Sequence, residues 1–127
     1  MLVVDDDAAI CQIYKEVLQG EGYDVVTAGT VAEAMAQMDA ANGGLDVLVV
    51  DLGLPDGDGG DFVRDATKRY GDRPTLFVSG WTDEFWQLNE APGRWVVMRK
   101  PVPIKRLLAA VRWLAHGGER PPELDEQ

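Results

Sequence analysis

Residues 45–51 read LDVLVVD, an apolar run that ends on a carboxylate, and residues 2–5 repeat the pattern as LVVD. Both runs are too short for a typical helix and are rich in β-branched residues, as is usual for strands buried on both faces. Three more runs of this kind follow, at residues 23–28, 74–79 and 95–99. The sequence therefore predicts five short strands, and strands buried on both faces are typical of parallel sheets.

Segments with helical spacing of apolar residues lie between the predicted strands. The first carries an apolar stripe from Ile10 to Leu18, and a capping box of Thr30 and Glu33 begins the second. Three more are expected, at residues 61–70, at 82–90, and from Pro103 to near Gly117. Strands that alternate with helices predict one parallel sheet with helices on both faces, a small doubly wound α/β domain.

Composition limits the class of protein and its partners. The chain has 127 residues, 46% of them hydrophobic, enough for one domain, expected at residues 1–116. The remaining residues 117–127 are polar, acidic and proline-containing, so a disordered tail is predicted. A net charge of −10 argues against nucleic acid and anionic membranes as partners. No apolar run approaches the ~18 residues of a membrane span, and the cytoplasm is the expected location.

Polar side chains stand at the carboxyl ends of the predicted strands. Asp5 and Asp6 follow the first strand, Asp51 closes the third, Ser79 closes the fourth, and Lys100 follows the fifth. Parallel strands present these ends at one edge of the sheet, where doubly wound domains bind ligands. Three carboxylates gathered there repel one another, and Mg²⁺, which prefers oxygen ligands, would offset the repulsion. A carboxylate, a metal, a lysine and a hydroxyl are the parts that phosphoryl transfer requires.

Four motifs occur in order along the chain: VVDDD at residues 3–7, VVDLGLPDGDG at 49–59, FVSG at 77–80 and MRKP at 98–101. In this order and at this spacing they resemble the receiver domain of two-component response regulators, over residues 2 to about 116. The resemblance implies a flavodoxin-like fold with the strand order 2-1-3-4-5. It also implies a bacterial phosphoacceptor signalling domain rather than an enzyme, apart from self-catalysed phosphotransfer and autodephosphorylation.

The same resemblance implies a role for each polar residue at this edge. Asp51 would accept a phosphoryl group from a histidine kinase or phosphotransfer protein, or slowly from a small phosphodonor. Lys100 would contact the Asp51 carboxylate and then the phosphoryl group, and the Ser79 hydroxyl would swing in to hydrogen-bond that group. Pro101 would follow a cis peptide bond. Mg²⁺ would be bound by Asp6, Asp51 and the backbone carbonyl of Gly53, with Asp5 helping through water. The phosphorylated chain would act on a downstream protein target, as a stand-alone response regulator or as the receiver part of a larger protein.

The expected switch region departs from the family pattern. Receivers often carry an aromatic residue three positions before the lysine, where this chain has Val97, which is short and stiff at χ1. Trp95 shares the strand face of Val97, and Trp81 follows the FVSG motif. We therefore expect the loop after residue 79 to carry the signal. Phe85 and Trp86, close to Trp81 in the sequence, predict either a docking face for a partner or the filling of a core beside a shortened helix.

The sequence also allows two other interpretations. Asp5 and Asp7 partly match the Asp-x-Asp motif of haloacid-dehalogenase-like phosphatases, although nothing acidic follows Lys100 until Glu119. A pseudo-receiver would keep the fold without being phosphorylated, and only a direct measurement of phosphorylation excludes it. Asp7 by itself is typical of a helix N-cap, and Cys11 of a small packing residue.

Overall fold

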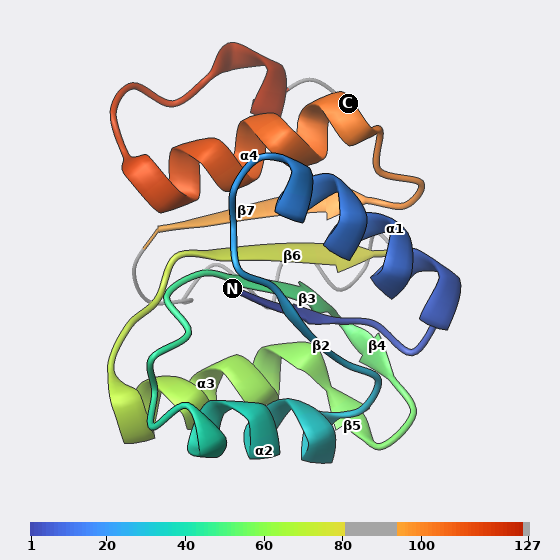
Figure 1. The fold of residues 1–127 in the computed structure, drawn as a ribbon, viewed down its shortest axis with the longest axis vertical. Helices are drawn as coiled ribbons and strands as arrows, with labels where there is room; N and C mark the ends of the chain where they lie inside the picture. Colours follow the sequence, from blue (N-terminus) through green and yellow to red (C-terminus); the bar gives the residue numbers. More distant parts are fainter. Residues whose placement is uncertain (81–93, 126–127) are drawn as a thin grey trace.

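Five parallel strands form a central sheet between two layers of helices, as Figure 1 shows. The structure is a computed structural model that describes residues 1–80 and 94–125. The sheet order is β2-β1-β3-β6-β7, which confirms the predicted order 2-1-3-4-5 for the five strands. Their bounds are Leu2–Val4 (β1), Val26–Ala28 (β2), Leu48–Asp51 (β3), Thr75–Ser79 (β6) and Trp95–Arg99 (β7).

Two strands begin three residues later than the apolar runs that predicted them. β2 begins at Val26 and β3 at Leu48, rather than at residues 23 and 45. Both pair with β1, and Leu2 is the first β1 residue opposite each of them. The start of β1 therefore sets where β2 and β3 begin. The hydrophobicity of the two runs does not reveal these starting points.

Within residues 1–80 and 94–125, four helices pack in pairs on the two faces of the sheet (Figure 1). The bounds of the pair on one face are Ala8–Gly20 (α1) and Ile104–His116 (α4), and those of the pair on the other are Val31–Ala40 (α2) and Gly59–Tyr70 (α3). Asp7 caps α1, because its Oδ1 accepts from the N–H of Ala9 at 2.9 Å. Thr30 caps α2 as the capping box predicted, with its Oγ1 3.0 Å from the Glu33 nitrogen. The helix expected at 82–90 lies outside the described residues.

The strands divide their side chains between two cores with period two. Leu2 and Val4 pack under α2 and α3, whereas Val3 between them packs under α1 and α4. All three are almost completely buried, as a parallel sheet covered on both faces requires. The apolar runs are continuous rather than alternating because both faces of each strand need apolar side chains. Of the helices in the described part of the chain, none has the length and apolar character to cross a membrane.

A two-stranded antiparallel hairpin follows β3 and has no counterpart in the sequence prediction. It consists of β4 at Gly53–Leu54 and β5 at Gly57–Asp58. Its sequence is rich in glycine, which favours turns and gives no pattern typical of strands. Short ladders of this kind depend on contacts with the rest of the fold, since two residue pairs alone do not make a stable hairpin.

The segment after α4 differs from the expected disordered tail. It folds back so that a 3-10 turn, Pro122–Asp125, lies against α4, and Leu124 is only 2% exposed. The Nε1 of Trp113 donates to the Gly118 carbonyl at 3.1 Å, and the Arg120 guanidinium lies 5.1 Å from the centre of the Trp113 ring. Composition predicts disorder here because Leu124 is the one aliphatic residue among polar residues, glycines and prolines. The end of the domain at residue 116 stays a prediction.

Candidate functional site

Four polar side chains converge at the carboxyl edge of the sheet. Asp51 ends β3, Ser79 ends β6 next to it, and Asp5 follows β1 on the other side of β3. Lys100 follows β7, and its backbone N–H donates to the Ser79 carbonyl at 2.8 Å. The peptide bond between Lys100 and Pro101 is cis. Topology alone therefore gathers residues that are far apart in the sequence.

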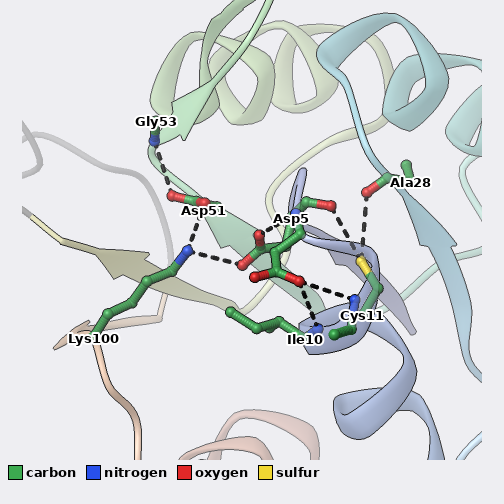
Figure 2. Close-up of polar contacts among 9 residues, drawn as sticks. Asp5, Ile10, Cys11, Ala28, Asp51, Gly53 and Lys100 are labelled. Carbon is green, nitrogen blue, oxygen red and sulfur yellow. Dashed lines mark hydrogen bonds and ion pairs between the residues drawn. The ribbon is translucent and has the colours of Figure 1, made fainter.

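The Lys100 ammonium joins the two buried carboxylates, as Figure 2 shows. Its Nζ lies 2.8 Å from Asp51 Oδ2 and 3.0 Å from Asp5 Oδ2. The second oxygen of each carboxylate accepts from backbone: Asp51 Oδ1 from the Gly53 N–H at 3.0 Å, and Asp5 Oδ1 from the Asp7 N–H at 2.9 Å. Every oxygen of the pair thus has a partner, as burial of ionised groups requires.

Burial and the neighbouring charges together shift the pKa values of Asp5 and Lys100. Burial raises the pKa of Asp5, and the nearby Asp51 charge adds to the rise, although the Asp7 N–H and Lys100 oppose it. Burial alone would lower the pKa of Lys100, but its hydrogen bonds to Asp51 and Asp5 and their charges raise it above the usual lysine value. The ammonium is therefore retained throughout the neutral range, and the site holds two carboxylates with a single compensating charge.

Asp6 completes a cluster of three carboxylates that can hold a metal. One oxygen each from Asp5, Asp6 and Asp51 lies within 4.8 Å of the others, and Asp6 is exposed whereas the other two are buried. A hard divalent cation such as Mg²⁺ fits this donor set, because all the ligand atoms are oxygens and the net charge is negative even with Lys100 in place. The open side at Asp6 leaves room for water ligands, which Mg²⁺ retains.

The loop beyond Asp51 passes so close to the site that only glycine fits at one position. A Cβ on Gly59 would stand 2.2 Å from the Asp51 carbonyl oxygen and 2.7 Å from Val50 Cγ1. Asp58 precedes it and caps α3, since its Oδ1 accepts from the Gly60 N–H at 2.6 Å. The Asp-Gly pair of the motif therefore begins α3 directly against the backbone of the candidate acceptor.

Several residues singled out from the sequence lie elsewhere or have other partners. Asp7 Oδ1 caps α1, and Asp7 is not part of the cluster of Asp5, Asp6 and Asp51, which argues against the Asp-x-Asp interpretation. Val97 and Trp95 are partly buried and pack against the core under α2 and α3, so they share one face of β7. Trp81 lies outside the described residues, together with Phe85 and Trp86.

Two contacts near the site were not predicted. Cys11 is 8% exposed, and its Sγ donates to the backbone carbonyl of Asp5 at 3.2 Å, which adds a hydrogen bond to its packing role (Figure 2). Burial raises the pKa of its thiol, which keeps it protonated and unreactive. The Asp56 carboxylate, in the hairpin, accepts from the N–H groups of Val31 and Ala32 in α2. An aspartate in a turn is ordinary in sequence, so no local signal indicated this contact.

This strand order, with an acidic edge and a lysine between two carboxylates, defines a receiver domain. The sequence model of the response regulator receiver domain matches residues 1–112, and the chain belongs to this family of two-component signalling proteins. Family membership implies phosphoacceptor signalling with a histidine kinase as partner, and receiver domains use Mg²⁺.

Similar proteins include both sensor kinases and transcriptional regulators. The transcriptional regulatory protein TrcR of Mycobacterium tuberculosis is 35% identical over 115 residues, which are 90% of this chain and 44% of that protein. The sensor kinase CckA of Brucella abortus is 30% identical over 113 residues, 88% of this chain and 12% of that protein. The chain thus spans less than half the length of these two relatives.

Solved receiver structures share the fold over nearly the whole chain. The chemotaxis protein CheY4 of Vibrio cholerae, crystallised at low pH, superposes with a TM-score of 0.78 at 31% identity, over 89% of this chain and 95% of that one. A CheY-like receiver domain protein of Methanospirillum hungatei gives 0.78 at 28% identity, over 98% and 92%. The fold is therefore CheY-like.

Proposed function

We propose that Asp51 of this chain accepts a phosphoryl group from the phosphohistidine of a kinase or phosphotransfer protein, or slowly from a small phosphodonor. The observation that carries the proposal is the Lys100 ammonium, held 2.8 Å from Asp51 and 3.0 Å from Asp5. In the transfer, an Asp51 oxygen bonds to phosphorus while the bond from phosphorus to the donor's imidazole nitrogen breaks. The electron pair stays on that nitrogen, and the product is an acyl phosphate on Asp51.

The residues around Asp51 have distinct tasks in this proposal. Mg²⁺ would be held by Asp6, Asp51 and the Gly53 carbonyl, with Asp5 acting through water, and when bound it neutralises charge on the phosphoryl oxygens. Lys100 supplies a second positive charge to these oxygens, and the Ser79 hydroxyl supplies a hydrogen-bond donor. Apart from its own phosphotransfer and autodephosphorylation, the domain turns over no substrate.

The proposed setting is a two-component pathway in the cytoplasm. Residues 1–116 would form the receiver and pass the signal to a downstream protein, either as a stand-alone regulator or as part of a longer one. A net charge of −10 supports protein partners rather than nucleic acid or an anionic membrane.

Incubation with acetyl phosphate and Mg²⁺, followed by intact mass spectrometry, tests the acceptor. The wild type should gain one phosphoryl mass, and Asp51→Asn should gain none. Asp7→Asn is the matched control, because Asp7 is a neighbouring carboxylate that caps α1, and it should still be labelled. Equal labelling of Asp51→Asn and the wild type would refute the assignment.

We infer that the loop after Ser79, rather than a swinging aromatic side chain on β7, carries the signal. Val97 is too short for a large swing. Beryllofluoride with Mg²⁺, which mimics the phosphoryl group, should change the tryptophan fluorescence of the wild type, and Ser79→Ala should reduce the change. Trp81→Phe should remove most of it. A full response in Trp81→Phe would place the signal at another tryptophan and refute this route.

A further inference from the structure

The hairpin after Asp51 carries the carbonyl assigned to the metal. Gly53 lies in β4, two residues beyond Asp51, and pairs with Asp58 of β5 across the hairpin. The segment is tied at its two ends, where the Leu52 N–H donates to the Val78 carbonyl at 2.9 Å and the Gly59 N–H to the Leu52 carbonyl at 3.1 Å. Two residue pairs are too few to hold a hairpin rigid by themselves. Gly53 itself donates its N–H to Asp51 Oδ1 at 3.0 Å, so an external support can still fix the hairpin tip and, through it, the direction of the Gly53 carbonyl.

Asp56, at the tip of the hairpin, makes a two-pronged contact with α2. Its Oδ1 accepts from the Val31 N–H at 2.7 Å and its Oδ2 from the Ala32 N–H at 3.1 Å. These N–H groups form the positive end of the helix, which favours a carboxylate, and they lower the pKa of Asp56. Within the described part of the chain, these are the hydrogen bonds that join the hairpin to α2.

Next to Asp56, the hairpin also lies within van der Waals range of α2. A Cβ placed on Gly57 would stand 3.4 Å from Val31 Cγ2, at the edge of ordinary contact. Asp56 therefore bonds α2 to a hairpin that already lies against this helix.

α2 has a cap of its own, so Asp56 is not needed to begin this helix. Thr30 Oγ1 accepts from the Glu33 N–H at 3.0 Å, and the Glu33 carboxylate accepts from the Gly29 N–H at 2.8 Å. Asp56 is exposed, so water can replace it at the Val31 and Ala32 N–H groups. Loss of the carboxylate should therefore release the hairpin more than it disrupts the helix.

We propose that Asp56 is a positioning residue for the metal site: by anchoring the β4–β5 hairpin to α2, it holds the Gly53 carbonyl in place for Mg²⁺. This rests on the proposed function, in which that carbonyl is a metal ligand. Residues that orient metal ligands change metal affinity without touching the ion. Asp56 does not contact a metal ligand directly but acts through the hairpin. We therefore expect its loss to lower the Mg²⁺ affinity less than the loss of a residue that bonds a ligand directly.

Calorimetric titration of the full chain with Mg²⁺ tests the proposal without relying on phosphorylation. Asp56→Ala, which removes both acceptors, should weaken Mg²⁺ binding about threefold to tenfold, less than the roughly tenfold to hundredfold loss typical of direct ligand partners. Asp56→Asn keeps one oxygen acceptor and should fall between Asp56→Ala and the wild type. Circular dichroism of each variant reports whether the fold is retained.

Two control variants test whether a loss of Mg²⁺ affinity comes from the Asp56 contact with α2 or from another cause. Thr30→Ala weakens the same end of α2 but leaves the Asp56 contact, and Asp65→Asn removes one exposed carboxylate on α3. Both should bind Mg²⁺ within about twofold of the wild type, since neither touches the hairpin or the ligands.

The outcomes distinguish failure of this inference from failure of the proposed function. Wild-type affinity in Asp56→Ala would overturn the positioning role and leave the metal site intact. An equal loss of affinity in Thr30→Ala would also overturn it, because α2 rather than the Asp56 contact would then be responsible. A wild-type chain that binds no Mg²⁺ would overturn both the inference and the proposed metal site.

Discussion

Replacement of Lys100 by methionine is the sharpest test of how the metal-free site is balanced. The variant keeps most of the side-chain length but removes the charge between Asp51 and Asp5. At an effective dielectric constant of about 20, each of the two contacts, at 2.8 and 3.0 Å, corresponds to about 6 kcal/mol of attraction. Without Lys100, the two carboxylates are left buried with only their repulsion and their backbone donors.

The net effect is much smaller than the sum of these attractions. Desolvation of the three charges offsets most of the attraction, and the Lys100 side chain is 26% exposed, so water screens it in part. We therefore expect Lys100→Met to lower the free energy of unfolding by about 2–4 kcal/mol without metal. The raised pKa of Lys100 keeps its contribution complete at neutral pH, since a raised lysine pKa gives stability that is lost only as the pH rises above about 10.

Urea unfolding at neutral pH, in EDTA and then in millimolar Mg²⁺, measures both parts of the prediction. Mg²⁺ should stabilise the variant more than the wild type, because it binds the folded state and replaces the missing positive charge. Lys105→Met, on the exposed surface of α4, is the matched control and should leave stability unchanged. Equal stability of Lys100→Met and the wild type in EDTA would refute the account of a site balanced by one lysine.

Three other substitutions test the structure around the site. Gly59→Ala should destabilise the fold by about 3 kcal/mol in urea unfolding, because the new Cβ meets the Asp51 carbonyl oxygen, which no rotamer change relieves; a stable variant would contradict that close approach. Leu124→Ala should lower stability by about 2 kcal/mol, because Leu124 is buried against α4; a loss too small to measure would contradict this packing and favour the disorder that composition predicts. The lowered pKa of Asp56 gives stability that is present above the unfolded value, 3.8, and lost as the pH falls through the folded one. The melting temperatures of the wild type and Asp56→Asn should therefore converge as the pH falls below 3.8, and a constant difference would refute the assignment.

The position of the site follows from local sequence and general topology. Short apolar runs that end on Asp5, Asp51 and Ser79 predict buried parallel strands, and parallel strands share one carboxyl edge. The caps at Asp7 and Thr30 were equally local, since each side chain bonds a nitrogen two or three residues away. Contacts of this kind can be predicted from the sequence because they join residues that are close together in the chain.

The bounds of the strands and the partners of the charges depended on segments that meet only in the folded chain. β2 and β3 begin where β1 gives them a partner. Lys100 stands 49 residues from Asp51, and the resemblance to receiver domains, rather than any local pattern, indicated their contact. Asp56 stands 25 residues from the Val31 nitrogen it binds, and nothing in the sequence indicated that contact. Leu124 is buried because a polar segment turns back over α4. Periodicity and composition contain no information on such contacts, because they average over neighbours in the sequence, whereas burial and ion pairing are decided by neighbours in space.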